Sequence, residues 1–118
     1  NPKYFQRMIH HEIFHMIQKS NSKYFDEEKW VSLNRGDFEY AKCSTCSDRL
    51  NLDLYKKTEG FLTEYSKSIP SEDMAEVFSF LMTDKAKVEV KSDDDMVLKN
   101  KIDFIKSSLL KIDSSFKF

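Results

Sequence analysis

His11-Glu12-Ile13-Phe14-His15 is the stretch that decides how this chain is built. It places two imidazoles four residues apart, and side chains at that spacing share one face of a helix, where both can ligate a single metal ion. Glu12 lies about 100° further round such a helix, where its carboxylate reaches a metal-bound water without ligating the metal itself. The stretch therefore predicts one half of a zinc site. The alternative is a pair of ordinary histidines on an amphipathic helix.

The residues around this stretch predict a helix over 3–19. Apolar side chains recur there with helical spacing, at Tyr4, Phe5, Met8, Ile9, Phe14, Met16 and Ile17. The polar cluster Lys19-Ser20-Asn21-Ser22 ends the pattern. His10 is adjacent to His11 and points elsewhere on a helix, so a third metal ligand has to be sought downstream.

Ser71-Glu72-Asp73-Met74-Ala75-Glu76-Val77-Phe78 is the best downstream source of that ligand. We expect a helix over about 71–83, with Ser71 as its N-cap, acidic residues in its first turn, and Pro70 ending whatever precedes it. Glu72 and Glu76 share a face, so one can ligate zinc while the other accepts a hydrogen bond from a ligating histidine. The alternative is a helix-start acid at Glu72 and a surface ion pair at Glu76.

Together these segments resemble the zinc signature of the gluzincins, whose third ligand is a glutamate on a second helix. A narrower likeness is to the peptidase domain of anthrax lethal factor and its relatives, because Tyr65 stands seven residues before Glu72 and follows Phe61-Leu62-Thr63-Glu64 in a similar order. The likeness covers the segments around 4–20 and 60–83.

The resemblance implies one catalytic zinc ion held by His11, His15 and Glu72, with Glu76 bound to a ligating histidine. It further implies Glu12 as the general base and Tyr65 as the group that stabilises the oxyanion or donates a proton. The implied activity is that of a zinc metallopeptidase, an endopeptidase that acts on proteins or peptides. Tyr65 could instead be a half-buried loop aromatic.

The fold class follows from the scarcity of turn residues. The 118 residues contain two glycines and two prolines, which favours helices over sheet. We expect a mainly α single domain over 1–118 and, on the resemblance, the zincin-like catalytic subdomain with an active-site helix, a glutamate helix and a C-terminal helix. That last helix opens at Asp93-Asp94-Asp95, as a solvated start, and runs to about Ile112.

The remaining segments carry weaker signals. Trp30-Val31-Ser32-Leu33-Asn34 is typical of a structured loop, and Gly36-Asp37 of a turn. Leu50, Leu52 and Leu54 alternate, which indicates a short strand.

The charge and hydropathy of the sequence indicate which kinds of molecule the protein can bind. Nineteen basic and twenty acidic residues leave a net charge of −1, which gives no electrostatic case for binding nucleic acid or an anionic membrane. No apolar run approaches the roughly 20 residues that span a bilayer. The expected partner is a protein or peptide substrate.

The start of the sequence indicates that a larger protein surrounds this domain, and the two cysteines bear on its cellular compartment. The sequence opens at Asn1-Pro2 and enters the metal-bearing helix almost at once, whereas a small sheet usually precedes that helix in such peptidases. We therefore expect part of a larger protein that carries the sheet lobe.

Cys43-Ser44-Thr45-Cys46 suits a loop disulfide, which favours a secreted protein, or two free thiols in a reducing compartment.

Two other classes of function stay open at this point. One is a catalytically inactive domain that keeps the peptidase fold as a binding or interaction module. The other is a structural helical domain whose histidines are incidental.

Overall fold

Helices form the framework of residues 2–43 and 58–118, the part of the chain that the computed structural model describes, and no strand occurs in that part. The five α-helices and two short 3₁₀ helices are α1 (Pro2–Ser20), η1 (Ser22–Tyr24), α2 (Glu27–Ser32), η2 (Tyr65–Lys67), α3 (Pro70–Thr83), α4 (Lys85–Asp93) and α5 (Met96–Ile112). The prediction of a mainly α fold is confirmed. The strand expected around Leu50, Leu52 and Leu54 lies outside the described residues.

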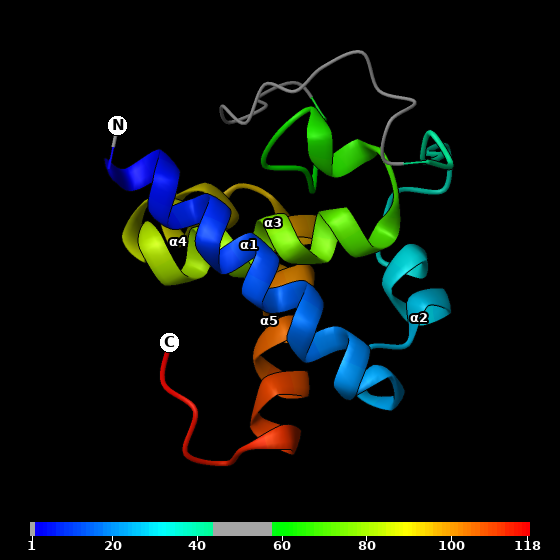
Figure 1. The fold of residues 1–118 in the computed structure, drawn as a ribbon. Coiled ribbons are helices and arrows are strands. Elements are labelled where there is room, and N and C mark those ends of the chain that lie inside the picture. Colours follow the sequence, from blue (N-terminus) through cyan, green and yellow to red (C-terminus); the bar gives the residue numbers. More distant parts are fainter. Residues whose placement is uncertain (1, 44–57) are drawn as a thin grey trace.

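α3 is the central helix. Ten consecutive residues from Glu72 to Leu81 are buried, so α3 is covered on every side and not along one stripe. α1 packs along one flank of α3, and α5 and α4 contact it as well (Figure 1). Ala75 is fully buried in α3, and Phe14 of α1 is fully buried against Phe78, with ring centroids 5.4 Å apart. This packing fixes α1 relative to α3.

The start of α3 differs from the prediction that Ser71 is its N-cap. Ile69 occupies the N-cap position in an extended conformation and makes no side-chain cap hydrogen bond, and Pro70 is the first helical residue. Proline suits that position because its fixed φ fits the helix and its missing N–H would have no partner there. Ile69 is extended because the residue before a proline avoids the helical region. Pro70 therefore begins the helix and does not merely end what precedes it.

The C-terminal third contains two helices where one was predicted. α4 ends at Asp93, and α5 begins at Met96 after an N-cap at Asp95. Asp93 and Asp94 are exposed, as expected for a solvated start, whereas Asp95 is 6% exposed and buried. Its carboxylate accepts hydrogen bonds from Leu98 N at 2.9 Å and from Gly60 N at 2.8 Å. Asp95 therefore caps α5 locally and also joins the start of α5 to the loop at Gly60.

The segment predicted as a loop from Trp30 to Asn34 begins inside a helix. Asp26 caps α2 by accepting a hydrogen bond from Lys29 N at 3.2 Å, and Trp30 is fully buried. The turn at Gly36-Asp37 is confirmed. No helix among the described residues has the length and apolar character needed to cross a membrane.

Candidate metal centre

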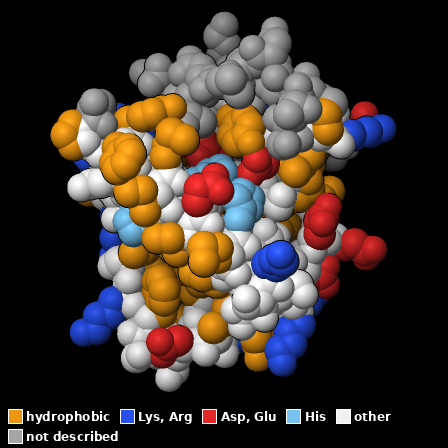
Figure 2. All heavy atoms as spheres, in the orientation of Figure 1, with side chains coloured by type: hydrophobic (Ala, Val, Ile, Leu, Met, Phe, Trp, Pro, Cys, Tyr) orange, Lys and Arg blue, Asp and Glu red, His pale blue; other side chains and the backbone are white. Residues whose placement is uncertain are grey.

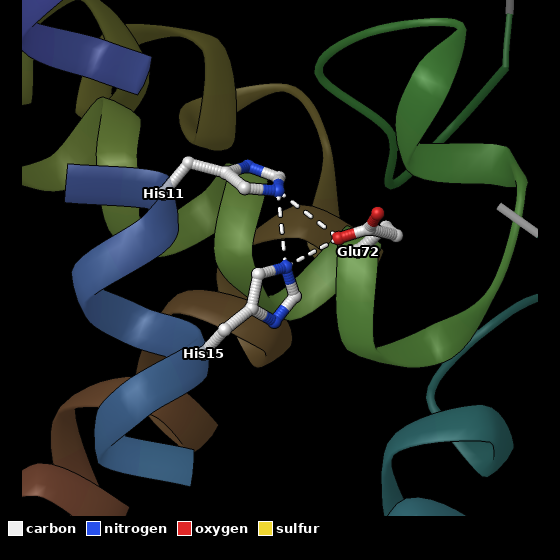
Figure 3. Close-up of side chains that lie close together, drawn as sticks. All are labelled: His11, His15 and Glu72. Carbon is white, nitrogen blue, oxygen red and sulfur yellow. Dashed lines mark hydrogen bonds and ion pairs between the residues drawn. The ribbon is translucent and has the colours of Figure 1, made fainter. Parts of the chain in front are cut away.

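α1 presents His11 and His15 to α3. The two rings stand one helical turn apart, and both point toward Glu72 (Figure 3). His11 is 8% exposed, whereas His15 is half-buried. His10 lies away from the pair and packs edge-on to Phe78, with ring centroids 6.2 Å apart. The shared face expected for His11 and His15 is therefore present.

α3 supplies two buried carboxylates to the same place. Glu72 directs Oε1 toward both histidines, 3.0 Å from His11 Nε2 and in short contact with His15 Nε2. Glu76, one turn later, accepts a hydrogen bond from His11 Nδ1 at 2.9 Å. Its other oxygen, Oε1, accepts from the Thr63 hydroxyl at 2.6 Å. Glu76 therefore orients His11 and is itself held in place.

Three donor atoms converge on one point. His11 Nε2 and His15 Nε2 lie 3.1 Å apart, and with an oxygen of Glu72 they form a group whose ligand atoms all lie within 4.8 Å of one another. Figure 2 shows the histidine and acidic side chains gathered at the centre of one face, bordered by hydrophobic side chains. Residues 57 to 65 positions apart in the chain are thus brought into one cluster.

This donor set fits a zinc ion. When His11 Nδ1–H donates to Glu76, its Nε2 keeps a lone pair that faces the other two donors. Ligands at about 2.0–2.1 Å from zinc in a tetrahedron stand about 3.3 Å apart. The separations of 3.0 and 3.1 Å around His11 Nε2 are close to that value. Two imidazoles and one carboxylate are also a ligand set that zinc commonly takes in catalytic sites.

Tyr65 enters the cluster from η2. Its hydroxyl donates a short hydrogen bond to Glu72 Oε2, and its ring lies beside that of His11, with centroids 5.9 Å apart. The loop before it is fixed by Thr63 and Ser66, because Ser66 N donates to Thr63 Oγ1 at 3.1 Å and Ser66 Oγ donates to Thr63 O at 2.6 Å. Both side chains are fully buried, so the position of Tyr65 is set by the loop.

The electrostatics of the cluster favour an ionised Glu72 beside a protonated His11 when no cation is bound. Burial lowers the pKa of His11, but its hydrogen bonds and charge interactions with Glu72 and Glu76 outweigh burial and raise that pKa to about 9. Burial raises the pKa of Glu72, yet hydrogen bonds from His11, His15 and Tyr65 hold it well below its usual range. Burial and the charge of Glu72 raise the pKa of Tyr65, so its hydroxyl stays a donor near neutral pH.

A cleft of about 270 Å³ opens beside the donors. Residues of α1, η2 and α3 form its walls, namely Tyr4, Arg7, Met8, His11, Glu12, Tyr65 and Glu76. Glu12 is exposed and does not belong to the group of three donors. Glu12 thus lines the cleft without being one of the three grouped donors.

A second buried polar cluster lies next to Glu72, and the sequence reasoning missed it. Asp73 Oδ2 accepts hydrogen bonds from Lys101 Nζ at 2.8 Å, Tyr40 OH at 2.6 Å and Trp30 Nε1 at 3.1 Å. Burial raises the pKa of Asp73 and lowers that of Lys101. The signal for this cluster was Lys101 itself, which stands in the inward stripe of α5 between Leu98 and Ile102. Thr63 was also missed; its spacing of three from Ser66 is typical of a local side-chain turn.

Fold and site together define a helical protein with a zinc-type donor set beside an open cleft. Residues 1–110 match the family model described as "Putative zinc-binding metallo-peptidase", and the chain belongs to that family. Neither a curated protein nor a solved structure matches the chain. The expected class, a zinc-binding metallopeptidase, agrees with the family. The narrower likeness to gluzincins and to lethal factor stays a prediction.

Proposed function

We propose that this protein is a zinc-dependent endopeptidase of the gluzincin type. The observation that carries the proposal is a three-atom donor set, one member of which, His11, lines a cleft together with Glu12 and Tyr65. A structural zinc site is normally closed by four protein ligands, whereas a catalytic site keeps a position open to water. The described residues offer three ligands and a cleft, which supports the catalytic kind of site.

In this proposal His11, His15 and Glu72 hold one zinc ion. When bound, the ion would lower the pKa of a water toward about 7 and polarise the scissile carbonyl. Glu76 fixes the tautomer and orientation of His11 through Nδ1, which increases the basicity of Nε2. Thr63 in turn fixes Glu76, so the ring of His11 has little freedom to turn away.

Glu12 is the proposed general base. Its exposed carboxylate lines the cleft on the same helix as both histidines, so it can take the proton of a water in that cleft and pass it to the leaving amine. A carboxylate suits both steps because it is ionised at neutral pH and remains a proton donor once protonated.

Tyr65 is the proposed oxyanion donor. Its hydroxyl is protonated at neutral pH, and its ring lines the cleft beside His11. A hydrogen bond from a donor placed there is strongest in the transition state, when negative charge develops on the carbonyl oxygen of the substrate. The hydrogen bond to Glu72 holds the ring at the cleft until a substrate arrives.

The test of the proposal has two measurements on one preparation. Elemental analysis of purified protein should give one zinc per chain, and the same material should cleave internal bonds in a peptide library. A chelator should abolish cleavage, and added zinc should restore it. Stoichiometric zinc without cleavage of any peptide would favour the binding-module alternative. Absence of zinc in material refolded with excess zinc would exclude both the zinc endopeptidase and a zinc-containing binding module.

A further inference from the structure

One buried hydroxyl, that of Thr63, contacts both the loop that carries Tyr65 and the group that orients His11. It donates a hydrogen bond of 2.6 Å to Glu76 Oε1, and it accepts one of 3.1 Å from the backbone N–H of Ser66. A hydroxyl has a single proton to donate and two lone pairs to accept with. The Thr63 hydroxyl therefore uses its one proton on Glu76 and a lone pair on the loop.

On the side of the metal donors, the hydroxyl leads to a proposed zinc ligand. Glu76 accepts from Thr63 on Oε1 and from His11 Nδ1 on Oε2, at 2.9 Å, so both of its oxygens are held. Thr63 and Glu76 are buried, at 0% and 2% exposure, so a lost bond between them leaves a buried oxygen without its donor. The plane of the Glu76 carboxylate, and with it the direction of the His11 ring, depends on Thr63.

On the side of the loop, the hydroxyl belongs to a closed turn. Thr63 N donates to Ser66 Oγ at 3.2 Å, and Ser66 Oγ donates to Thr63 O at 2.6 Å. Together with the bond from Ser66 N, three hydrogen bonds join the two residues, as in a local side-chain turn. Tyr65 lies within this turn and begins η2. The backbone at Tyr65 is therefore placed relative to the same hydroxyl that holds Glu76.

We propose that the turn from Thr63 to Ser66 supports the zinc site, with Thr63 as a positioning residue that acts on His11 through Glu76. The inference rests on the proposed function, since His11 is a zinc ligand there. It goes further in making zinc affinity depend on the turn that carries Tyr65, although no residue of that turn is a ligand. One hydroxyl thus keeps a metal ligand and the proposed oxyanion donor in a fixed relation.

Zinc affinity tests this support without requiring turnover. Thr63→Val keeps the size and branching of the side chain but loses the hydroxyl. It should weaken zinc binding by about tenfold, the lower end of the range for partners that orient a ligating histidine. Thr63→Ser keeps the hydroxyl and should bind zinc nearly as tightly as the parent protein. Competition with a chelator at one pH gives the dissociation constants, and circular dichroism checks that each variant is folded before zinc is added.

A double-mutant cycle identifies the route of the effect. Glu76→Ala removes the group through which Thr63 is proposed to act, so adding Thr63→Val to it should cause little further loss of zinc affinity. Ser66→Ala removes two of the three bonds of the turn. It should weaken zinc binding in the parent protein but add little to Thr63→Val.

Ser108→Ala is the matched control for the loss of a buried hydroxyl. Ser108 is 4% exposed, and its hydroxyl donates to Tyr24 O at 2.7 Å, outside the cluster and the cleft. Its removal costs a hydrogen bond of the same kind but touches neither Glu76 nor the turn. The zinc affinity of Ser108→Ala should therefore equal that of the parent protein.

Three results would overturn the proposal: unchanged zinc affinity in Thr63→Val, equal losses in Thr63→Val and Thr63→Ser, or an undiminished effect of Thr63→Val in the Glu76→Ala background. If Thr63→Val does not fold, Ser66→Ala carries the test, and parental zinc affinity in that variant overturns the proposal. A parent protein that binds zinc but cleaves no peptide contradicts the proposed function alone, because the comparison of zinc affinities still decides the role of Thr63. A parent protein that binds no zinc overturns both.

Discussion

Lys101 of α5 donates a hydrogen bond of 2.8 Å to Asp73 of α3, and neither side chain is exposed to solvent. Lys101 Nζ also donates to Gly60 O at 2.9 Å and lies 3.6 Å from the ring centroid of Phe61. Asp73 is the residue directly after Glu72. The ion pair therefore joins the C-terminal helix and the loop at Gly60 to the turn of α3 that carries a proposed zinc ligand.

Lys101→Met should destabilise the fold. It leaves Asp73 buried without its cationic partner, and the loss of one partner from a buried pair typically costs about 3–5 kcal/mol. Adding Asp73→Asn should recover most of that loss, because no uncompensated charge remains. Denaturant unfolding of the single and double variants measures both effects. A single variant as stable as the double variant would show that the charge of Asp73 is not what Lys101 compensates.

Gly60 supports the same connection. Its φ is +92°, and a Cβ there would lie 2.3 Å from Val97 Cγ1 of α5. Glycine is therefore required at this position both by its backbone conformation and by the close approach of α5. Because Gly60 has no side chain, the loop that leads to Tyr65 can pack directly on α5 at Val97.

Glu12→Gln should keep zinc and lose activity. The carboxylate is proposed to handle a proton and not the metal, so the variant should bind zinc like the parent and cleave peptides several orders of magnitude more slowly. His15→Ala should instead lose the metal. Zinc content and the initial rate on one peptide are measured for both. Loss of zinc from Glu12→Gln would contradict its assignment as the base.

Tyr65→Phe should separate catalysis from metal binding. Removal of one oxyanion donor lowers kcat by about 10²-fold or more in comparable sites. Zinc content should be retained, since the hydroxyl contacts Glu72 and is not among the three donor atoms. Tyr24→Phe, a half-buried tyrosine outside the cleft, is the control. An unchanged kcat in Tyr65→Phe would return Tyr65 to the role of a packed loop aromatic.

Glu72 and Glu76 should differ in how strongly they support zinc. Glu72→Ala should remove most zinc binding, whereas Glu76→Ala should weaken it by about 10- to 100-fold, the usual range for a residue that orients a ligating histidine. Competition with a chelator at one pH gives both affinities, and Glu89→Ala in the exposed part of α4 serves as the control. The reverse order would exchange the two roles. A negligible loss of zinc affinity in both variants would rule out the proposed zinc site.

The spacing of side chains within single helices predicted much of this site. His11 with His15, and Glu72 with Glu76, each recur at four residues, so each pair shares a face whatever the rest of the chain does. The approach of α1 to α3 was an expectation from a family resemblance, and the structure brings the four side chains together. Tyr65 joins them through a loop that Thr63 and Ser66 fix locally.

Contacts between distant segments could not be predicted in this way. Asp73 and Lys101 are 28 residues apart, and each by itself suits an exposed helix position. The buried role of Asp95 depends on the loop at Gly60, which no local pattern around Asp93-Asp94-Asp95 indicates. The start of α3 was misplaced because a local cap rule chose Ser71, whereas proline geometry decided the observed start. The start of α5 lies within the predicted triplet, at Asp95, which caps Leu98 N locally.

Zinc binding should release a proton from His11 at neutral pH. Without metal, the pKa of His11 is raised from 6.5 to about 9, so the imidazole is protonated at pH 7 and must lose that proton to ligate zinc. The contribution of His11 to zinc affinity should therefore increase about tenfold per pH unit as the pH rises toward 9, and level off above it. The stability of the metal-free protein should depend on pH in the opposite direction to zinc affinity. The raised pKa of His11 stabilises the fold fully below pH 6.5, and this stabilisation is lost as the pH rises through about 9.

Calorimetric titration with zinc at pH 8, in two buffers of different ionisation enthalpy, counts the protons released. The parent protein should release close to one proton from His11. Glu76→Gln keeps a hydrogen-bond acceptor but removes one of the charges that raise the pKa of His11, so fewer protons should be released at this pH. Heats that are equal in the two buffers for the parent protein would mean that His11 is already neutral, and that Glu72 and Glu76 do not hold a proton on it.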